Sequence, residues 1–188
     1  MTDKPLCIDL FCLPGGWTNG FLAMGFRVIG FNTPAPQSII GGYQGELVLQ
    51  DVMTLDGHRL RRLRPRVIVA GPPCTWFSLA RTSGRDPARG MVLVREAMRV
   101  IREADPNYWC IENVRGAYAA ICAEFGQPIR PGRHNEAYWF WGNIPIPNLP
   151  LIRKTHTTLG LGNKTTRGWD HSRIPLELSV PIAEVCLS

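Results

Sequence analysis

The alternation of short apolar runs with helical segments over the first 125 residues constrains the fold more than any other feature of the chain. Five runs have the length and apolar content of buried strands, at residues 5–12, 26–31, 46–50, 66–70 and 108–112. Three segments predict helices, at residues 17–24, 91–104 and 116–125. Strands that alternate with helices form a mostly parallel sheet with helices on both faces. We therefore expect an α/β domain whose ligand binds outside the carboxyl ends of the strands.

The last third of the chain has a different pattern. Residues 137–141 are mostly aromatic and predict a core segment, and residues 144–150 are interrupted by prolines. Residues 154–173 are polar, basic and rich in Thr and Gly, which favours an extended lobe or loop. A final helix is expected over residues 179–187, with Pro181 in its first turn, where a proline is tolerated.

Size and composition exclude several classes of protein. A chain of 188 residues that is 45% hydrophobic and 19% charged suits one globular domain, and it contains no apolar run long enough to span a bilayer. Its net charge of +6 favours a polyanionic partner. The six cysteines have no paired CxxC spacing and the N-terminus has no signal-like layout, so we expect reduced thiols in a cytoplasmic protein. No metal site is expected, because the histidines lack metal-ligand spacing: His58, His134, His156 and His171.

Three motifs follow the first, fourth and fifth predicted strands. They are Asp-Leu-Phe-Cys-Leu-Pro-Gly-Gly at residues 9–16, Gly-Pro-Pro-Cys at residues 71–74 and Glu-Asn-Val at residues 112–114. A parallel sheet brings the ends of these strands to one edge. Each motif also has a plain structural interpretation: a turn, a buried cysteine and a surface ion pair. Together they predict a site with a nucleotide-like ligand, one thiol and one carboxylate.

In this order and spacing the motifs resemble those of the DNA cytosine-C5 methyltransferase family. The resemblance covers about the whole chain, and the length and the Arg-x-x-Arg-His segment at residues 130–134 are most similar to short phage-encoded members. It implies a Rossmann-like class I methyltransferase fold. It also implies transfer of a methyl group from S-adenosylmethionine to C5 of cytosine in double-stranded DNA, with the target base flipped out of the stack.

The resemblance assigns the catalytic roles. Cys74 would add to C6 of cytosine, because C5 is a poor nucleophile until a thiolate raises its electron density. Glu112 would contact N3 and N4 of the base, and Asn113 would orient that carboxylate. The family binds the cytosine O2 and the catalytic loop with an Arg-x-Arg element, which Arg130 and Arg133 match with one residue more between them.

The donor site matches the family less closely. Leu13 and Pro14 stand where the family has its first glycine and the neighbouring residue, and Asn32 stands where it offers an acid to the ribose hydroxyls. An amide can still bind a hydroxyl, but without the charge that strengthens such bonds. The residues expected to bind the donor are Phe11, Leu13, Gly15, Gly16, Asn32, Asp51, Val52, Pro72, Ser179 and Val180.

Little of the chain remains for reading a DNA sequence. Family members carry a large recognition domain here, whereas this chain offers only a reduced lobe at about residues 150–174 of a single domain covering residues 1–188. Sequence recognition is therefore expected to be short or relaxed. Within this lobe, the residues expected to contact phosphates or stack on bases are Arg153, Lys154, Lys164, Arg167 and Trp169.

Two alternatives stay open at this point. The same covalent chemistry could use a different or modified donor, or act on a free cytosine nucleotide, and the residues at Leu13, Pro14 and Asn32 motivate this hypothesis. The second alternative is a non-catalytic relative that only binds nucleic acid. The presence of both Cys74 and Glu112 argues against it, because binding alone needs no activated thiol.

Overall fold

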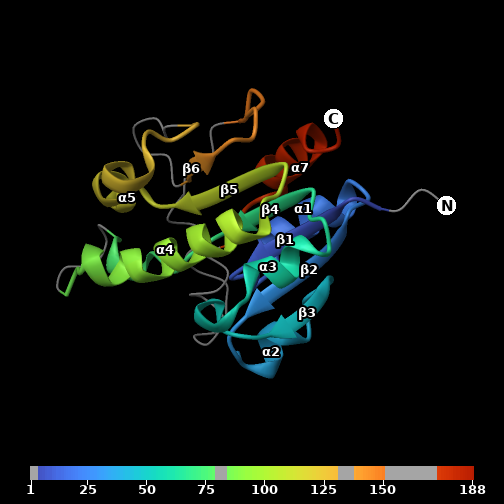
Figure 1. Cartoon of the computed structure of the whole chain (residues 1–188), viewed down its shortest axis with the longest axis horizontal. Coiled ribbons are helices and arrows are strands. Elements are labelled where there is room, and N and C mark those ends of the chain that lie inside the picture. The colour runs from blue at the N-terminus through green and yellow to red at the C-terminus, as the bar shows by residue number, and fades with distance from the viewer. Residues whose placement is uncertain (1–3, 79–83, 131–137, 151–172) are drawn as a thin grey trace.

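A single six-stranded sheet organises the chain (Figure 1). The computed structural model describes residues 4–78, 84–130, 138–150 and 173–188. The strand order is β3-β2-β1-β4-β5-β6, with every neighbouring pair parallel except β5 and β6, which are antiparallel. The strands are β1 (Leu6–Leu10), β2 (Arg27–Asn32), β3 (Glu46–Leu49), β4 (Val67–Ala70), β5 (Tyr108–Asn113) and β6 (Trp139–Gly142). The expected mostly parallel α/β sheet is confirmed.

Helices cover both faces of the sheet. One face packs against α1 (Gly16–Ala23) and α7 (Leu176–Val185), and the other packs against α3 (Gly57–Arg61) and α4 (Pro87–Ala104). Helix α5 (Tyr118–Phe125) extends the α4 side, since its Ile121 is buried in one cluster with Trp139 and Trp141 of β6. The short helix α2 (Gln37–Ile40) and three 3-10 turns complete the described elements: η1 (Val52–Thr54), η2 (Cys74–Trp76) and η3 (Arg115–Ala117). No helix in these described ranges is long and apolar enough to cross a membrane.

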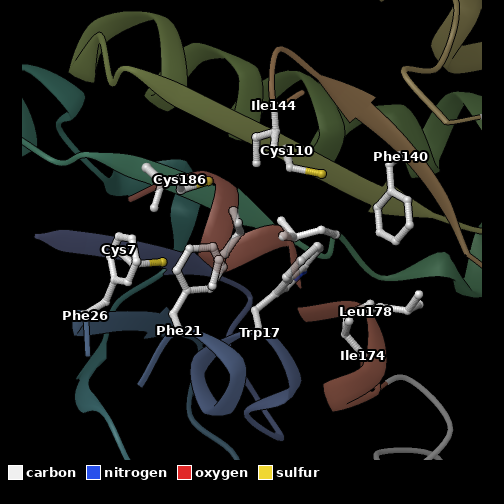
Figure 2. Close-up of a cluster of buried hydrophobic side chains, with 14 of the residues drawn as sticks. Cys7, Trp17, Phe21, Phe26, Cys110, Phe140, Ile144, Ile174, Leu178 and Cys186 are labelled. Carbon is white, nitrogen blue, oxygen red and sulfur yellow. The ribbon is translucent and has the colours of Figure 1, made fainter. Parts of the chain in front are cut away.

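The core on the α1 and α7 side contains the largest aromatic side chains. Figure 2 shows Trp17 and Phe21 of α1 and Leu178 of α7 directed toward the strands. The Trp17 ring meets the Phe140 ring of β6 edge-on, with 5.9 Å between centroids. Burial of these rings removes a large apolar area from water and holds the C-terminal helix against the sheet.

The described part of the aromatic run, residues 138–141, contributes to the core as expected, since Trp139, Phe140 and Trp141 are buried. The sequence did not indicate that this run forms β6, an antiparallel edge strand beside β5. Four residues of mostly aromatic sequence show neither strand alternation nor helical spacing. The strand therefore depends on the hydrogen-bonding edge that β5 offers.

Two predicted helix starts are wrong. The helix expected at residue 91 begins at Pro87, because the Asp86 side chain accepts the backbone N–H of Arg89 at 3.0 Å and proline suits the first turn. The last helix begins at Leu176, so Pro181 lies in its interior. Packing of Leu178 and Ser179 against α1 offsets the hydrogen bond that Pro181 cannot donate.

Contact between α1 and α7 requires a glycine. A side-chain carbon at Gly20 would lie 2.3 Å from Ser179 Oγ and 2.7 Å from the Ser179 backbone carbon. We expect Gly20→Ala to lower the free energy of unfolding by roughly 1 to 3 kcal/mol, even though alanine favours helix, because α7 must move outward. Urea denaturation measures the change.

Gly42→Ala is the matched control, since the nearest atom to its added carbon, the Ile39 carbonyl oxygen, lies 3.8 Å away. Its effect should stay within about 0.5 kcal/mol. Equal stability of the two variants would contradict the close packing of α1 on α7.

Candidate functional site

A cavity of about 280 Å³ lies where β1, β4 and β5 end. This edge of the sheet, called the carboxyl edge, brings the three sequence motifs together. The residues that line the cavity are Asp9, Phe11, Cys12, Leu13, Pro14, Gly16, Trp17, Asn32, Thr33, Gly71, Pro73, Cys74, Thr75, Glu112 and Ile174. Segments distant in sequence therefore share one wall, as parallel strands require.

Cys74 is the accessible thiol of this cavity. All six cysteines are free, and Cys74 is partly exposed. Cys12 also lines the cavity, but it is buried, and burial raises the pKa of its thiol far above the ordinary value. Because the thiolate is the reactive form, Cys12 is a poor nucleophile and Cys74 is the candidate.

The turn that bears Cys74 is tied to the end of β5. The Cys74 carbonyl accepts the N–H groups of Phe77 and Ser78, each at 3.0 Å. The fully buried Asn113 donates its side-chain N–H to the Pro72 carbonyl at 3.0 Å, and its oxygen accepts the Val114 N–H at 2.9 Å. Asn113 therefore links the Pro-Pro-Cys turn to the Glu-Asn-Val segment.

Glu112 lies beside that turn. A side-chain carbon at Gly71 would be 4.0 Å from Glu112 Oε2. Glu112, near the end of β5, and Cys74, after β4, therefore line the same cavity.

Arg130 lies on the same face of the sheet as Glu112 but farther out. Glu112 is paired with Phe140 of β6, and Phe140 is bridged in turn to Arg130. Side chains directly opposite each other on antiparallel strands project from the same face, so these three form a row. The Arg130 guanidinium stands 5.9 Å from the Phe140 ring centroid and donates to the Pro150 carbonyl at 3.2 Å. Arg130 is not among the cavity-lining residues.

Asp9 is a buried carboxylate at the cavity. Its Oδ2 accepts the Thr18 N–H at 3.1 Å and the Thr18 hydroxyl at 2.7 Å, and Tyr43 reaches the same hydroxyl at 2.7 Å. Among the described residues its Oδ1 has no hydrogen-bond partner. Burial raises the pKa of Asp9 to about 7, although the two bonds from Thr18 act to lower it. A donor or cation in the cavity would supply the missing partner.

A second, smaller cavity of about 150 Å³ adjoins the first and shares Phe11, Asn32, Thr33 and Pro73 with it. Its other lining residues are Leu10, Phe31, Asp51, Val52 and Leu93. The two cavities form an elongated site that crosses the ends of β1 and β2, with Asn32 and Phe11 at its middle.

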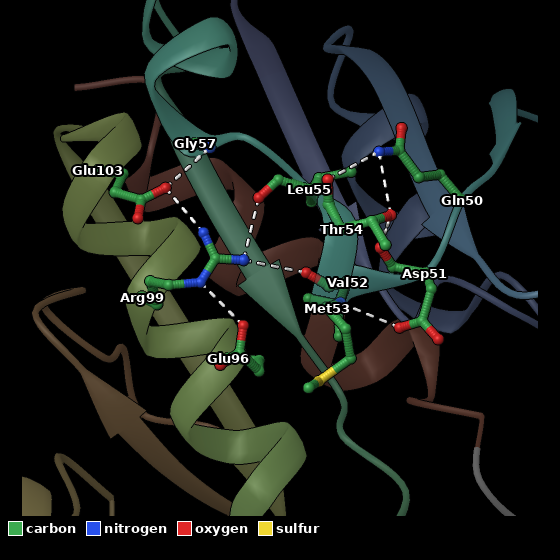
Figure 3. A network of polar contacts seen from close by, with 10 residues as sticks. All are labelled: Gln50, Asp51, Val52, Met53, Thr54, Leu55, Gly57, Glu96, Arg99 and Glu103. Atoms are coloured by element: carbon green, nitrogen blue, oxygen red, sulfur yellow. Dashed lines mark hydrogen bonds and ion pairs between the residues drawn. The ribbon is translucent and has the colours of Figure 1, made fainter.

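Arg99 of α4 supports the outer wall of this second cavity (Figure 3). Its guanidinium donates to the carbonyls of Val52 at 3.2 Å and Leu55 at 3.0 Å. It is held by ion pairs to Glu96 and Glu103, both at 2.8 Å. On the same segment Asp51 accepts the Met53 N–H at 3.0 Å. The loop that carries Asp51 and Val52 is thereby fastened to α4.

Four residues expected to bind the donor do not line either cavity. Gly15 has a φ of 90° just before α1, where it permits the turn. Pro72 is buried and presents its carbonyl to Asn113, so the neighbouring Pro73 lines both cavities instead. Ser179 packs on Gly20, and Val180 lies beside it within α7.

Several expected site residues lie outside the described ranges: Arg133, Arg153, Lys154, Lys164, Arg167 and Trp169. Conversely, sequence reasoning did not assign Asp9, Pro73, Leu93 or Ile174 to the site. Asp9 opens the first motif and could have been found there, since a carboxylate within a fully buried strand needs a partner. Ile174 carried no such indication. Within the described ranges, no cluster of His, Cys, Asp or Glu could hold a metal ion.

Comparison with known proteins adds to this geometry. A family model described as C-5 cytosine-specific DNA methylase matches residues 6–120. Type II methyltransferase M.AquIA of Picosynechococcus is 34% identical over 145 residues, which cover 65% of this chain and 57% of that protein. Type II methyltransferase M1.HphI of Haemophilus parahaemolyticus is 32% identical over 120 residues, covering 57% of this chain and 32% of that protein.

Among solved structures, a DNA modification methyltransferase encoded within a prophage of E. coli matches with a TM-score of 0.52 and 22% identity, over 74% of this chain and 46% of that one. At this identity the likeness concerns the fold, and it confirms the expected Rossmann-like methyltransferase architecture. The chain spans about half the length, or less, of these relatives.

Asp9 makes stability depend on pH. The pKa of about 7 in the folded protein exceeds the value of about 3.9 of an exposed aspartate, so between these values the folded state holds a proton that the unfolded state has lost. The free energy of unfolding should therefore fall as pH rises from about 4 to 7, by at most about 1.4 kcal/mol per pH unit. Asp9→Asn should lose less stability across the same window.

Urea denaturation of both proteins at several pH values isolates this contribution, because every other titrating group is common to them. Parallel stability curves for wild type and Asp9→Asn would show that the carboxyl has an ordinary pKa.

Proposed function

The chain belongs to the C-5 cytosine-specific DNA methylase family, and on this basis we propose that it transfers a methyl group from S-adenosylmethionine to C5 of cytosine in DNA. The main support is that Cys74 and Glu112 share one cavity with the loop that follows β1. A nucleophile, a base-binding carboxylate and a nucleotide-type ligand site are what this reaction needs, within reach of one another.

Cys74 supplies the nucleophile. Its Sγ adds to C6 of cytosine, and the electron pair of the C5–C6 bond makes C5 able to take the methyl group. The donor contributes an electrophilic methyl group on a sulfonium. Loss of the C5 proton to a base then re-forms the double bond and expels the Cys74 thiolate. The bonds from Phe77 and Ser78 to the Cys74 carbonyl keep the turn in place through these steps.

Glu112 activates the base. A carboxyl group that holds N3 and N4 of cytosine stabilises the charge that develops on the ring when sulfur adds to C6. Asn113 acts as a positioning residue rather than by touching the base: its bond to the Pro72 carbonyl fixes the distance between the Glu112 and Cys74 segments. Arg130, which lies beyond β6, and Arg133 complete the proposed set.

The residues of the two adjoining cavities fit the donor. An ammonium group at its methionine end would give Asp9 Oδ1 the partner it lacks. Phe11 and Asn32 at the middle of the site suit the ribose, and Asp51 and Val52 in the smaller cavity suit the adenine. Gly16 and Ile174 both line the larger cavity. The Ile174 backbone lies so close to Gly16 that no side chain would fit there.

DNA is the proposed substrate, with the target cytosine flipped out of the duplex. Both catalytic side chains lie in a cavity rather than on a protruding surface, and a stacked base cannot enter one. The proposal also includes a single-domain arrangement with a reduced recognition lobe at about residues 150–174.

A modified donor remains the second candidate, and one observation favours it. Asn32 lines both cavities, so the neutral side chain occupies the middle of the donor site, where the family presents an acid. A neutral site tolerates a donor with an additional anionic group better than an acidic site does. Nucleosides from DNA treated with the protein distinguish the two donors by the mass that is added.

Cys74→Ser should form no covalent adduct with DNA, because a hydroxyl is a far weaker nucleophile than a thiolate near neutral pH. The measurement is intact-protein mass after incubation with S-adenosylmethionine and mixed-sequence DNA synthesised with 5-fluorocytosine, which blocks loss of the C5 substituent. Wild type should gain the mass of a covalently bound strand. Cys12→Ser is the matched control and should form the adduct, since its thiol is buried.

Absence of an adduct with wild type, or an adduct that depends on Cys12, would overturn the covalent assignment. A nucleoside of unaltered mass from treated DNA would overturn the transfer reaction itself.

Arg99→Met should weaken donor binding about fivefold, the equivalent of roughly 1 kcal/mol, because the loop with Asp51 and Val52 loses its hydrogen bonds to α4. KM for S-adenosylmethionine should rise while kcat changes little, since the methyl end of the site is untouched. Arg95 lies on the same helix as Arg99 and forms an ion pair with Glu124 of α5. Arg95→Met removes this ion pair and should leave KM unchanged. Equal effects of both variants would exclude a positioning role for Arg99.

A further inference from the structure

A stacked arginine and tryptophan pair lies directly after the nucleophile. The Arg89 guanidinium sits over the Trp76 ring, 4.1 Å from its centroid. Trp76 is the last residue of η2, the turn that begins with Cys74, and Arg89 is in the first turn of α4. Stacking of this kind holds the guanidinium plane over the ring and leaves its N–H groups, which point outward in that plane, able to donate.

The first turn of α4 is fastened to η2 by two further contacts. The Asp86 N–H donates to the Trp76 carbonyl at 3.2 Å. The fully buried Phe77 ring packs against Gly90 so closely that a side-chain carbon there would lie 2.5 Å from Phe77 Cζ. Arg89 is therefore positioned by the same packing that positions the Cys74 turn.

Two more arginines lie close in sequence to segments that line the cavity. Arg85 precedes Asp86, and Arg115 follows the Glu-Asn-Val segment as the first residue of η3. Ala117 of η3 and Phe77 share one buried cluster, which places the two turns side by side. Figure 1 shows the start of α4 and helix α5, which follows η3, at the same end of the sheet.

These three residues, called the edge arginines (Arg85, Arg89 and Arg115), are all exposed. Within the described ranges no carboxylate pairs with any of their guanidinium groups. Farther along α4 the pattern differs, because Arg95 pairs with Glu124 and Arg99 pairs with Glu96 and Glu103. Exposed guanidinium groups without acidic partners are suited to phosphates, which they can bind with two parallel hydrogen bonds.

Resting on the proposed function, we propose that the edge arginines bind phosphates of the DNA strand that carries the target cytosine, with Arg89 held ready by its stack on Trp76. A base that leaves the duplex for the cavity needs its backbone held on both sides of the cavity mouth. Arg85 and Arg89 lie at the start of α4, which is bonded to the Cys74 turn, and Arg115 lies three residues after Glu112. On this arrangement we expect the contacts to fall on both sides of the mouth. Phosphate contacts carry no sequence information, so these contacts would form with any DNA sequence.

The test is the salt dependence of DNA binding, measured by fluorescence anisotropy with a mixed-sequence duplex. Each phosphate contact contributes about 0.9 to the slope of log affinity against log salt, so Arg89→Ala should lower the slope by about one unit and the triple alanine variant by about three. One phosphate contact, with its slope of about 0.9, corresponds to about eightfold in affinity between 1 M and 0.1 M salt. A duplex of unrelated sequence should give the same changes.

Arg102→Ala is the matched control. Arg102 is exposed on the same helix and lies 5.7 Å from the Phe125 ring centroid, in the last turn, far along the chain from the cavity. The Arg102→Ala variant should bind the duplex with the same slope of log affinity against log salt as wild type. Trp76→Leu should weaken binding while the slope stays at the wild-type value, because the charge of Arg89 remains but its position is no longer held.

The proposal is overturned if wild type binds no duplex, if Arg89→Ala keeps the wild-type slope, or if Arg102→Ala loses as much. It is also overturned if Arg89→Ala lowers affinity for S-adenosylmethionine in calorimetry as much as affinity for DNA, since that indicates a structural effect. The 5-fluorocytosine adduct separates this proposal from the proposed function. If wild type forms the adduct but the arginine variants keep the wild-type slope, only the role of the edge arginines is refuted. If the variants change the slope but wild type forms no adduct, only methyl transfer is refuted.

Discussion

Parallel pairing of β1 with both of its neighbours, β2 and β4, is the constraint on which the rest of the structure depends. Parallel strands end at the same edge, so the loops that follow β1, β2, β4 and β5 must meet there. Every residue of β1 and β4 is buried, which requires helices on both faces and long connections between the strands. The cavity is the space that these converging loops leave between them.

Polar contacts between different elements hold this edge together, and two of them join segments more than 40 residues apart in the sequence. Asn113 links the turn after β4 to the end of β5, Thr18 of α1 holds Asp9 at the end of β1, and Arg99 fastens the loop after β3 to α4. These groups are buried or partly buried, where an unsatisfied donor or acceptor is costly. These contacts therefore hold the loops of the site in defined positions.

Much of the fold could be predicted, and the failures have physical reasons. The five parallel strands follow from apolar runs bounded by turn residues, and the α4 end at Ala104 follows from Asp105 and Pro106. Edge strand β6 could not be predicted, because three aromatic residues and a glycine become a strand only beside β5. The sequence also did not predict that Pro181 lies inside α7, since the packing of α7 on α1 outweighs the local cost of a proline. In the site, Cys74 and Glu112 were found from their motifs, whereas Ile174 joins the cavity only through the docking of the C-terminal segment.

By itself the sequence determined the class of fold, the order of the five parallel strands along the chain, and the residue types available for chemistry at the strand ends. These depend on local periodicity and on turn residues, which act within a few positions of the chain. Only the tertiary structure decided which thiol is accessible, Cys74 or Cys12, and that the pKa of Asp9 is raised to about 7. Accessibility and pKa depend on burial and on neighbours from other strands, and no local pattern in the sequence encodes them.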